Sequence, residues 1–371
     1  MMERLLPEVC KIQYGYAFDS AKFTTNIGIP LVRIRDVVRG FSETYTTEEC
    51  DKEYIVQNGD ILIGMDGEFN IARWKGGRAY LNQRVCRLTP KIAVDSTYLY
   101  YFMPKALKEI EDKTPFVTVK HLSAKELNKI IVPIRPIEEQ KKIAAELQNI
   151  DKLIELRKQQ LSKLDELVKS RFIELFGDPV YNTKNLPTKR LAELGSLDRG
   201  RSQHRPRNAP ELLGGPYPLI QTGEVANAGL YITGYSNTYS ELGLKQSKMW
   251  KAGTLCITIA ANIAQTSILT FDACFPDSVV GFIPGDSISA IYMHYWFGFF
   301  QKILEEQAPQ VAQKNINLKI LSDLSVVVPN QEQQKDFIAF VEQTDKSKLA
   351  IQQSLEKLET LKKALMQQYF G

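Results

Sequence analysis

Two stretches of the chain carry apolar residues at the spacing expected of long, paired helices. In the first stretch the steps alternate between four and three residues, and the members are Ile143, Leu147, Ile150, Ile154, Leu161, Leu164 and Val168. The second stretch begins with polar Thr344 and Lys348 at the equivalent places, and the apolar pattern continues through Ile351, Leu355, Leu358 and Leu365. A seven-residue repeat of this kind is typical of a coiled-coil seam.

The two stretches are also copies of each other. Residues 140–177 align with residues 334–371 without a gap, and 13 of the 38 positions are identical. Both copies end in Phe-Gly, at Phe176-Gly177 and at Phe370-Gly371. We therefore predict the order globular module, helix, globular module, helix, in which two helices of equal length pair with each other. The alternative is two separate amphipathic helices, each packed on its own module.

The segment before each long helix has the pattern of a module that mixes strands and helices, with the strands first. Strand-like segments punctuated by glycine lie at 29–37, 60–65, 85–88, 219–222 and 254–259, and an aromatic-rich helix is expected at about 96–112 and 288–306. The predicted fold class is α+β: two repeated modules of mixed α/β structure, separated by two long helices that pair with each other as a coiled coil. The predicted boundaries are 1–137 and 177–331 for the modules, with 138–176 and 332–371 for the helices.

Composition narrows the class of protein. The chain has 371 residues and a formal net charge of +4, so bulk charge alone would not hold it to nucleic acid. Its five cysteines are widely spaced and form no CxxC pair, which favours a reducing cytoplasm over a disulfide framework or a zinc site. No apolar run approaches the length that a transmembrane helix needs, so we expect no membrane association.

Motifs for catalysis are missing from the sequence. There is no glycine-rich phosphate loop, and the three histidines do not lie at metal-ligand spacing from one another or from a cysteine. Asp66 and Glu68 could suggest a carboxylate pair for a metal ion, but a turn between strands is the simpler interpretation. We therefore expect no catalytic residues, no metal and no cofactor in this chain, and we interpret it as a binding protein.

Basic residues cluster in both modules, in segments interpreted as loops rather than helical faces. Arginine and lysine suit phosphate oxygens and guanine, and asparagine and glutamine suit adenine. The candidates for contacts with DNA are Arg33, Arg35, Asn70, Arg73, Lys75, Arg78 and Arg84 in the first module, and Arg199, Arg201, Gln203, Arg205, Arg207, Asn262 and Gln265 in the second. Each cluster alone could be a solvated loop, and their presence in both modules favours nucleic acid.

Several blocks of sequence, taken in order, resemble the specificity subunit of type I restriction–modification systems. They include Ile29-Pro30-Leu31-Val32-Arg33, Gly59-Asp60-Ile61-Leu62-Ile63-Gly64, Leu81-Asn82-Gln83-Arg84, Pro136-Ile137-Glu138-Glu139-Gln140 and Glu174-Leu175-Phe176-Gly177-Asp178-Pro179. The resemblance covers essentially the whole chain. The order of the blocks is specific, whereas no single block is.

The resemblance implies two target-recognition domains, each reading one half of a bipartite and asymmetric DNA site. It implies that the helices pair as an antiparallel coiled coil, which sets the unread spacer. It also implies that two methylation subunits dock on the helices and bring S-adenosylmethionine. A restriction subunit using ATP and Mg²⁺ can join the complex; the recognised bases, the spacer length and the stoichiometry are left open.

A rival hypothesis from the sequence is a structural adaptor, in which the two modules bind proteins and the helices only mediate oligomerisation. The two hypotheses differ in one observable property. An adaptor would bind DNA weakly, without regard to sequence and with a shallow dependence on salt, whereas a DNA reader loses affinity steeply as salt rises.

Overall fold

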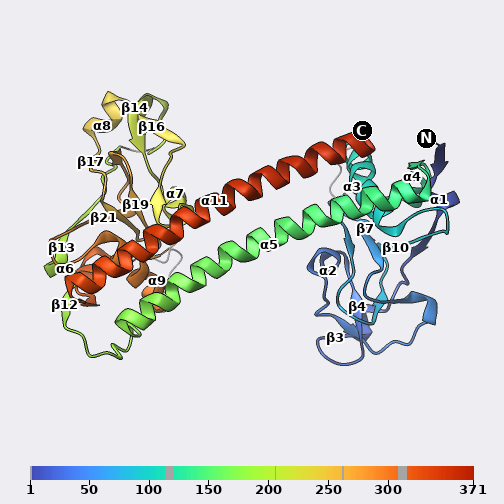
Figure 1. The fold of residues 1–371 in the computed structure, drawn as a ribbon, viewed down its shortest axis with the longest axis horizontal. Coiled ribbons are helices and arrows are strands. Elements are labelled where there is room, and N and C mark those ends of the chain that lie inside the picture. Colours follow the sequence, from blue (N-terminus) through green and yellow to red (C-terminus); the bar gives the residue numbers. More distant parts are fainter. Residues whose placement is uncertain (1, 114–119, 205, 261–262, 308–315) are drawn as a thin grey trace. The chain divides into compact units, whose positions relative to one another are not determined.

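The computed structural model describes residues 2–113, 120–204, 206–260, 263–307 and 316–371. The chain forms two compact units, each of which contains one module and part of both long helices. Unit 1 comprises Met1–Lys158 and Gln353–Gly371, and unit 2 comprises Gln159–Gln352. Each unit is described below by itself, with the elements labelled in Figure 1.

Unit 1 is built from three sheets and a layer of helices. Its strands are β1 (Met2–Leu5), β2 (Cys10–Tyr14), β3 (Phe23–Thr24), β4 (Ile29–Val32), β5 (Tyr45–Thr46), β6 (Ile55–Val56), β7 (Ile61–Gly64), β8 (Ile71–Arg73), β9 (Ala79–Leu81), β10 (Val85–Pro90) and β11 (Ile131–Ile134). Its shorter helices are α1 (Leu6–Val9), α2 (Ile34–Arg39), α3 (Ser96–Lys113) and α4 (Ala124–Asn128). The strand orders are β1-β11, β2-β10-β7-β8 and β3-β5-β4-β9-β6.

Unit 2 repeats this plan. Its strands are β12 (Thr188–Arg190), β13 (Gly195–Arg199), β14 (Leu213–Leu219), β15 (Tyr231–Ile232), β16 (Asn237–Tyr239), β17 (Met249–Trp250), β18 (Leu255–Thr258), β19 (Thr266–Leu269), β20 (Ala273–Cys274), β21 (Val279–Pro284) and β22 (Ser325–Val327). Its shorter helices are α6 (Leu191–Leu194), α7 (Thr222–Asn227), α8 (Glu241–Lys245), α9 (Ala290–Gln307) and α10 (Leu318–Ser322). The strand orders are β12-β22, β13-β21-β18-β19-β15 and β16-β14-β20-β17.

The sheets confirm the internal repeat at the level of strand pairing. One sheet has four strands that pair antiparallel in the same order in both units, β2-β10-β7-β8 and β13-β21-β18-β19. In a second sheet, the parallel pair β4·β9 of unit 1 corresponds to the parallel pair β14·β20 of unit 2. The mixed α+β fold of two similar modules is therefore as predicted.

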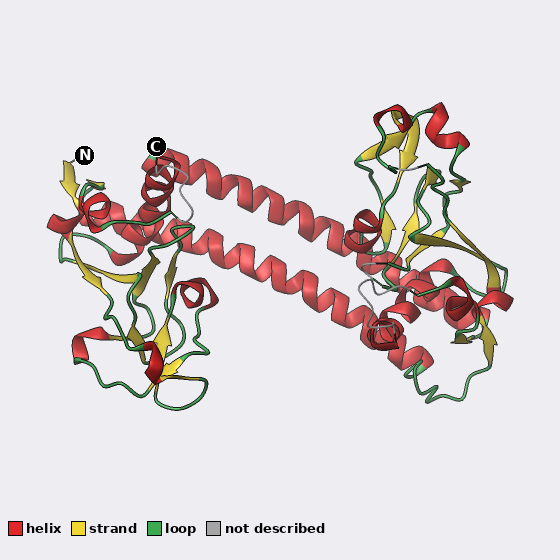
Figure 2. Cartoon of the chain, turned by 180° about the vertical axis from the view of Figure 1, so that it is seen from behind, coloured by secondary structure: helices red, strands yellow, loops and turns green. Residues whose placement is uncertain are grey.

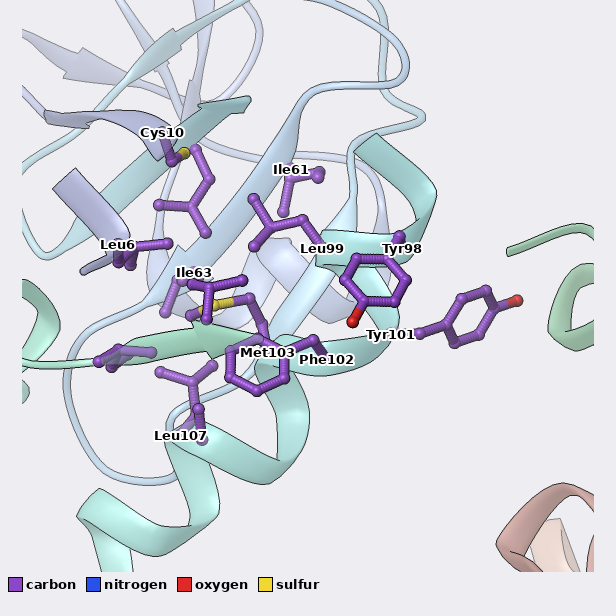
Figure 3. Close-up of a cluster of buried hydrophobic side chains, with 14 of the residues drawn as sticks. Leu6, Cys10, Ile61, Ile63, Tyr98, Leu99, Tyr101, Phe102, Met103 and Leu107 are labelled. Carbon is purple, nitrogen blue, oxygen red and sulfur yellow. The ribbon is translucent and has the colours of Figure 1, made fainter. Parts of the chain in front are cut away.

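Each module has a main core between its long aromatic helix and one sheet, the one that contains β7 in unit 1 and β18 in unit 2. Figure 3 shows part of the core of unit 1, where Tyr98, Phe102 and Met103 of α3 face Ile61 and Ile63 of β7. Burial of this kind stabilises the fold by roughly 25 cal/mol for each Å² of apolar surface removed from water. Buried aromatic residues of both helices, such as Tyr98 of α3 and Tyr292 of α9, thus belong to the cores.

The two long helices are α5 (Ile137–Phe176) and α11 (Gln331–Phe370), each of 40 residues. They run side by side within each unit (Figures 1 and 2). Three ion pairs join them: Asp151 with Lys362 at 2.6 Å, Lys158 with Glu359 at 3.5 Å, and Asp165 with Lys348 at 2.6 Å. Residues later in α5 thus pair with residues earlier in α11, so the helices are antiparallel. The antiparallel pairing of the long helices is confirmed. The predicted domain boundaries remain a prediction.

The predicted seam differs in burial along its length. Ile143, Leu147, Ile150, Val168 and Leu355 are buried, whereas Ile154, Leu161, Leu164, Ile351, Leu358 and Leu365 are half-buried. The polar start of the second helix is accommodated locally, because the Thr344 hydroxyl donates to the Phe340 carbonyl at 2.8 Å and Lys348 pairs with Asp165 across the two helices.

The strand predicted at 29–37 is wrong in its second half. The prediction that the arginines of this segment lie in a loop is corrected as well. Strand β4 ends at Val32, and residues 34–39 form helix α2, so that Arg35 lies on a helix. The carboxylate of the fully buried Asp36 accepts a hydrogen bond from the backbone N–H of Arg33 at 2.9 Å. An acidic side chain at this place satisfies one of the free N–H groups at a helix start, and it begins the helix here.

Candidate nucleic-acid interface

The basic candidates of the first module divide into residues bound within the protein and residues facing solvent. Arg73 belongs to the first kind: its guanidinium donates to the Gly59 carbonyl at 3.0 Å and to the hydroxyls of Ser96 and Thr97 at 3.1 Å each. It also lies over the ring of Tyr100, with 5.4 Å between the guanidinium carbon and the ring centroid. Arg73 therefore holds strand β8 to the start of α3.

Lys75 and Arg78 are exposed in a turn that follows the buried Trp74. The turn is ordered, because the Trp74 indole N–H donates to the Gly77 carbonyl at 2.7 Å and the Gly77 N–H donates to the Asn58 side chain at 2.7 Å. A Cβ placed on Gly40, at the end of α2, would lie 3.5 Å from the Lys75 Cβ. The structure thus brings the end of α2 to the Lys75 turn.

Arg33 and Arg35 lie at the start of α2, and both are exposed. The Arg35 guanidinium donates to the Thr44 hydroxyl at 3.3 Å and lies 3.5 Å from the Asp36 carboxylate. Asn70 is half-buried just before β8. Helix α2 therefore carries Arg33 and Arg35 at its start and meets the Lys75 turn at its end, whereas the Arg73 guanidinium is bound within the protein.

A third group in the first module forms around Asp66. The Asp66 carboxylate lies 2.5 Å from His121 Nδ1 and 3.7 Å from the Arg84 guanidinium, and Arg84 lies 3.3 Å from the same histidine nitrogen. Arg84 has a φ of 71°, a left-handed conformation that is uncommon for a non-glycine residue. Asp66 therefore acts as an ion-pair partner in a turn, in agreement with the turn interpretation of the sequence.

In the second module, two predicted arginines converge on one residue. The Arg199 guanidinium donates twice to the Asp277 carbonyl, at 3.0 and 2.7 Å, and the Arg207 guanidinium lies 2.6 Å from the Asp277 carboxylate. The backbone N–H groups of Gln203 and His204 donate to the Gln246 side chain at 2.6 and 3.0 Å. The basic loop is thereby anchored at several points, which leaves Arg201 exposed on it.

The remaining candidates lie elsewhere or outside the described residues. Gln265 is half-buried, and its backbone exchanges hydrogen bonds with Thr258. Arg205 and Asn262 fall outside the residues that the structure describes. The roles of all these residues in DNA contact remain predictions.

The loop that follows β2 in the first module and β13 in the second begins at an equivalent glycine. The N–H of Gly15 donates to the Val85 carbonyl at 3.0 Å, and that of Gly200 donates to the Val279 carbonyl at 2.9 Å. A Cβ on either glycine would lie 2.3 Å or less from a backbone oxygen, so any other residue type would clash there. The shared start shows that the two loops correspond.

The two corresponding loops differ in chemistry. The loop after Gly200 is basic, whereas the loop after Gly15 presents Tyr16, which is 38% exposed and has its ring 4.9 Å from that of Phe18. The sequence analysis did not include Tyr16. The glycine at the start of both loops could have indicated Tyr16, because it aligns this loop with the basic loop after Gly200.

Lysine 248 is another residue that the sequence analysis missed. Its ammonium group lies 2.7 Å from the Asp198 carboxylate and 4.0 Å from the centroid of the Trp250 ring. The hydrogen bond from Lys248 is the main reason that the pKa of Asp198 lies below its usual value. The pair fixes the Lys248 ammonium group beside the basic loop of the second module, with its charge balanced by Asp198.

Comparison with known proteins follows the duplication seen in the fold. A family model described as type I restriction modification DNA specificity domain matches residues 1–166 and matches again at residues 184–362. The chain belongs to this family. Each match covers one module with most of the long helix that follows it, so the chain contains two copies of the specificity domain.

Relatives in the specificity family match over most of the chain. The EcoBI specificity subunit of Escherichia coli is 28% identical over 372 residues, which cover 91% of this chain and 78% of that protein. The MjaVIII specificity subunit of Methanocaldococcus jannaschii is 24% identical over 345 residues, which cover 85% of this chain and 79% of that protein.

Solved structures of the specificity family share the fold. The S subunit of a type I restriction-modification system from M. genitalium superposes with a TM-score of 0.62 at 14% identity, covering 98% of this chain and 94% of that chain. A chain from a study of complex assembly and conformational transition of the type I R-M system gives 0.60 at 17% identity, covering 100% and 97%. Both likenesses concern the fold.

The described residues also lack two features. Among the helices that the structure describes, none combines the length and apolar character needed to cross a membrane. Within the same described ranges, no three histidine, cysteine or acidic side chains gather in a way that could hold a metal ion.

Proposed function

We propose that this chain reads a bipartite, asymmetric DNA sequence, one half with each recognition module. The observation that supports this most strongly is the duplication: two specificity domains with the same strand order, each joined to one member of an antiparallel helix pair. Asymmetry of the site follows from the loops, because the loop after Gly15 is aromatic and the loop after Gly200 is basic. Modules with different loops would read different half-sites.

The helix pair acts, in this proposal, as the ruler between the half-sites. A two-helix rod resists bending and torsion better than an irregular linker, so it holds two readers at a fixed separation and rotation. Salt bridges between the helices, such as Asp151 with Lys362, and the buried part of the seam keep the two helices in register.

The chain also recruits methylation subunits, and restriction subunits where the system has them. Supporting this, the long helices expose leucines that the seam does not use: Leu153 and Leu156 in unit 1 and Leu349 in unit 2 are 44%, 44% and 61% exposed. Exposed apolar side chains along a helix suit a protein partner. Methyl transfer with S-adenosylmethionine, and cleavage with ATP and Mg²⁺, belong to those partners, and a cytoplasmic location suits such a complex.

The test is to map methylated bases in DNA from cells that carry this chain with its methylation subunits. We expect one asymmetric, two-part motif with a gap of constant length. Replacing residues 177–331 by the matching module of a relative should change one half of that motif only. A change in both halves, or methylation without a motif, would contradict the proposal and favour the adaptor hypothesis.

A further inference from the structure

A buried glutamine lies at the start of each long helix. Gln140 and Gln334 are only 0% and 4% exposed, and they occupy equivalent places in the internal repeat. The N–H of Asp95 donates to Gln140 Oε1 at 2.9 Å, and Gln140 Nε2 donates to the carbonyls of Ala93 and Arg135 at 3.2 and 2.8 Å. Both N–H groups and the oxygen of this amide are therefore used.

Gln334 repeats this arrangement in unit 2. The N–H of Ser289 donates to Gln334 Oε1 at 3.0 Å, and Gln334 Nε2 donates to the carbonyls of Ser287 and Pro329 at 3.0 Å each. All three partners lie 194 residues after those of Gln140, the same offset that relates the long helices. The arrangement is thus a property of both halves and not an accident of one.

The amide joins three separate segments of its module. In unit 1 these are the turn between β10 and α3, the connection between β11 and α5, and the first turn of α5. Asp95 also receives the N–H groups of Thr97 and Tyr98 at 2.9 Å each, so the start of α3 is tied to the start of α5 through one residue. Hydrogen bonds are directional, so this junction defines a rotation as well as a position.

A second attachment lies near the first. The Tyr98 hydroxyl donates to the Pro133 carbonyl at 2.7 Å, and the Tyr98 ring lies 5.2 Å from that of Phe370 at the end of α11. In unit 2, Tyr292 donates to Val327 at 2.8 Å and lies 5.0 Å from Phe176 at the end of α5. Each module therefore holds the start of one helix and the end of the other.

The two attachments do different work. The second attachment combines one hydrogen bond, from the Tyr98 hydroxyl, with apolar contacts that have no preferred direction, whereas the amide makes three directional hydrogen bonds. We propose that Gln140 and Gln334 are positioning residues that fix the rotation of each recognition module about the helix pair. This proposal rests on the proposed function for its consequence, which is that these amides restrict the spacer length accepted between half-sites.

The geometry of DNA makes such a restriction sharp. One turn of the double helix contains about 10–10.5 base pairs, so adding one base pair turns the second half-site by about 35°. A module free to rotate by that angle could follow the half-site to a neighbouring spacer length. A module locked in rotation could not.

The first experiment uses the complete complex with its methylation subunits. Gln140→Leu removes the three hydrogen bonds at nearly constant volume, and Gln148→Leu on the exposed face of the same helix is the matched control. In the Gln140→Leu complex we expect methylation at sites whose spacer is one base pair longer or shorter to rise at least tenfold, with both half-sites unchanged. The control should keep the single native spacer.

The second experiment needs no DNA and uses the isolated chain. Spin labels on Lys52→Cys and Lys152→Cys, both exposed and both in unit 1, report the distance between module and helix in a Cys50→Ser background. We expect the distance distribution to become at least twice as wide with Gln140→Leu and to stay narrow with Gln148→Leu. Gln140→Glu keeps the acceptor for the Asp95 N–H but sets a carboxylate against the two carbonyls that the amide donates to, so it should widen the distribution as well.

The outcomes separate the two proposals. A lower melting temperature for Gln140→Leu, with an unchanged distance distribution and an unchanged spacer, would show that the amide stabilises the fold without fixing its rotation. A wild-type complex that methylates without a two-part motif would overturn the proposed function, while the spin-label widths would still decide the rotation.

Discussion

At the scale of single residues, arginines that look alike in the sequence have different tasks in the structure. Arg73 is held by Gly59, Ser96 and Thr97, whereas Arg201 is exposed on the basic loop. Sequence composition placed both among the candidates for DNA contact. Composition cannot separate them, because the partners of Arg73 lie up to 24 residues away along the chain.

We predict that Arg201→Ala and Arg73→Ala affect different properties. Arg201→Ala should weaken binding to all DNA sequences and lower the slope of affinity against salt by about 1, as expected for one phosphate contact. Arg73→Ala should instead lower the free energy of unfolding by about 1 kcal/mol, because the half-buried hydroxyls of Ser96 and Thr97 lose their hydrogen bonds to the guanidinium. Salt-dependent binding and chemical unfolding measure the two effects, with the surface variant Arg190→Ala as control. Equal loss of salt dependence in both variants would contradict this assignment.

His294 predicts how stability depends on pH. The imidazole accepts or donates a hydrogen bond with Thr266 at 3.0 Å, and burial, with a smaller contribution from nearby Lys348, lowers its pKa from 6.5 to about 4. Between these two pH values the unfolded chain binds a proton that the folded chain does not, so the free energy of unfolding falls as the pH falls. The expected loss between pH 7 and pH 5 is at most about 2 kcal/mol.

The comparison that checks this prediction is urea unfolding of the wild type and of His294→Gln at both pH values. Glutamine can keep a hydrogen bond to Thr266 and does not titrate. The variant should lose less stability than the wild type on going from pH 7 to pH 5. Equal losses in the two proteins would show that His294 is not the group responsible.

At the scale of elements, local periodicity predicted the long helices well, because the seven-residue pattern depends only on neighbours along one helix. The pattern ran from Ile143 to Val168, and the helix extends from Ile137 to Phe176. The short helix α2 escaped prediction, because a single side chain, Asp36, begins it. The glutamine junction also escaped: Gln140 and Gln334 stood out as identical in the repeat, but their partners are set by the tertiary fold.

The burial of the seam leads to a prediction for leucines of α11. Leu355 is 6% exposed and Leu349 is 61% exposed. Leu355→Ala should lower the free energy of unfolding by about 2–3 kcal/mol, because the removed atoms leave a cavity between elements. Leu349→Ala should change it by less than about 0.5 kcal/mol. Chemical unfolding followed by helical circular dichroism gives both values, and similar values for the two variants would argue against the seam.

At the scale of the whole molecule, the proposed ruler predicts the result of lengthening a helix. Four residues inserted into α5 between Ile143 and Val168 add about 6 Å of helix, close to the rise of two base pairs at about 3.4 Å each. We expect the spacer of the methylated motif to change, or recognition to be lost through the disturbed helix pairing. Methylation mapping detects either result. An unchanged spacer with unchanged activity would remove the ruler from the proposal.

The seating of Phe370 against Tyr98 has a consequence for the order of events during translation. Unit 2 is one continuous segment, Gln159–Gln352, whereas unit 1 needs Gln353–Gly371 as well. The Lys105 ammonium group, which binds the Phe370 carbonyl, leaves the ribosome 265 residues ahead of it. At about 5–20 residues per second the first-made module waits tens of seconds for its last side chain. Synthesis of unit 2 is therefore complete before that of unit 1, although unit 1 begins first.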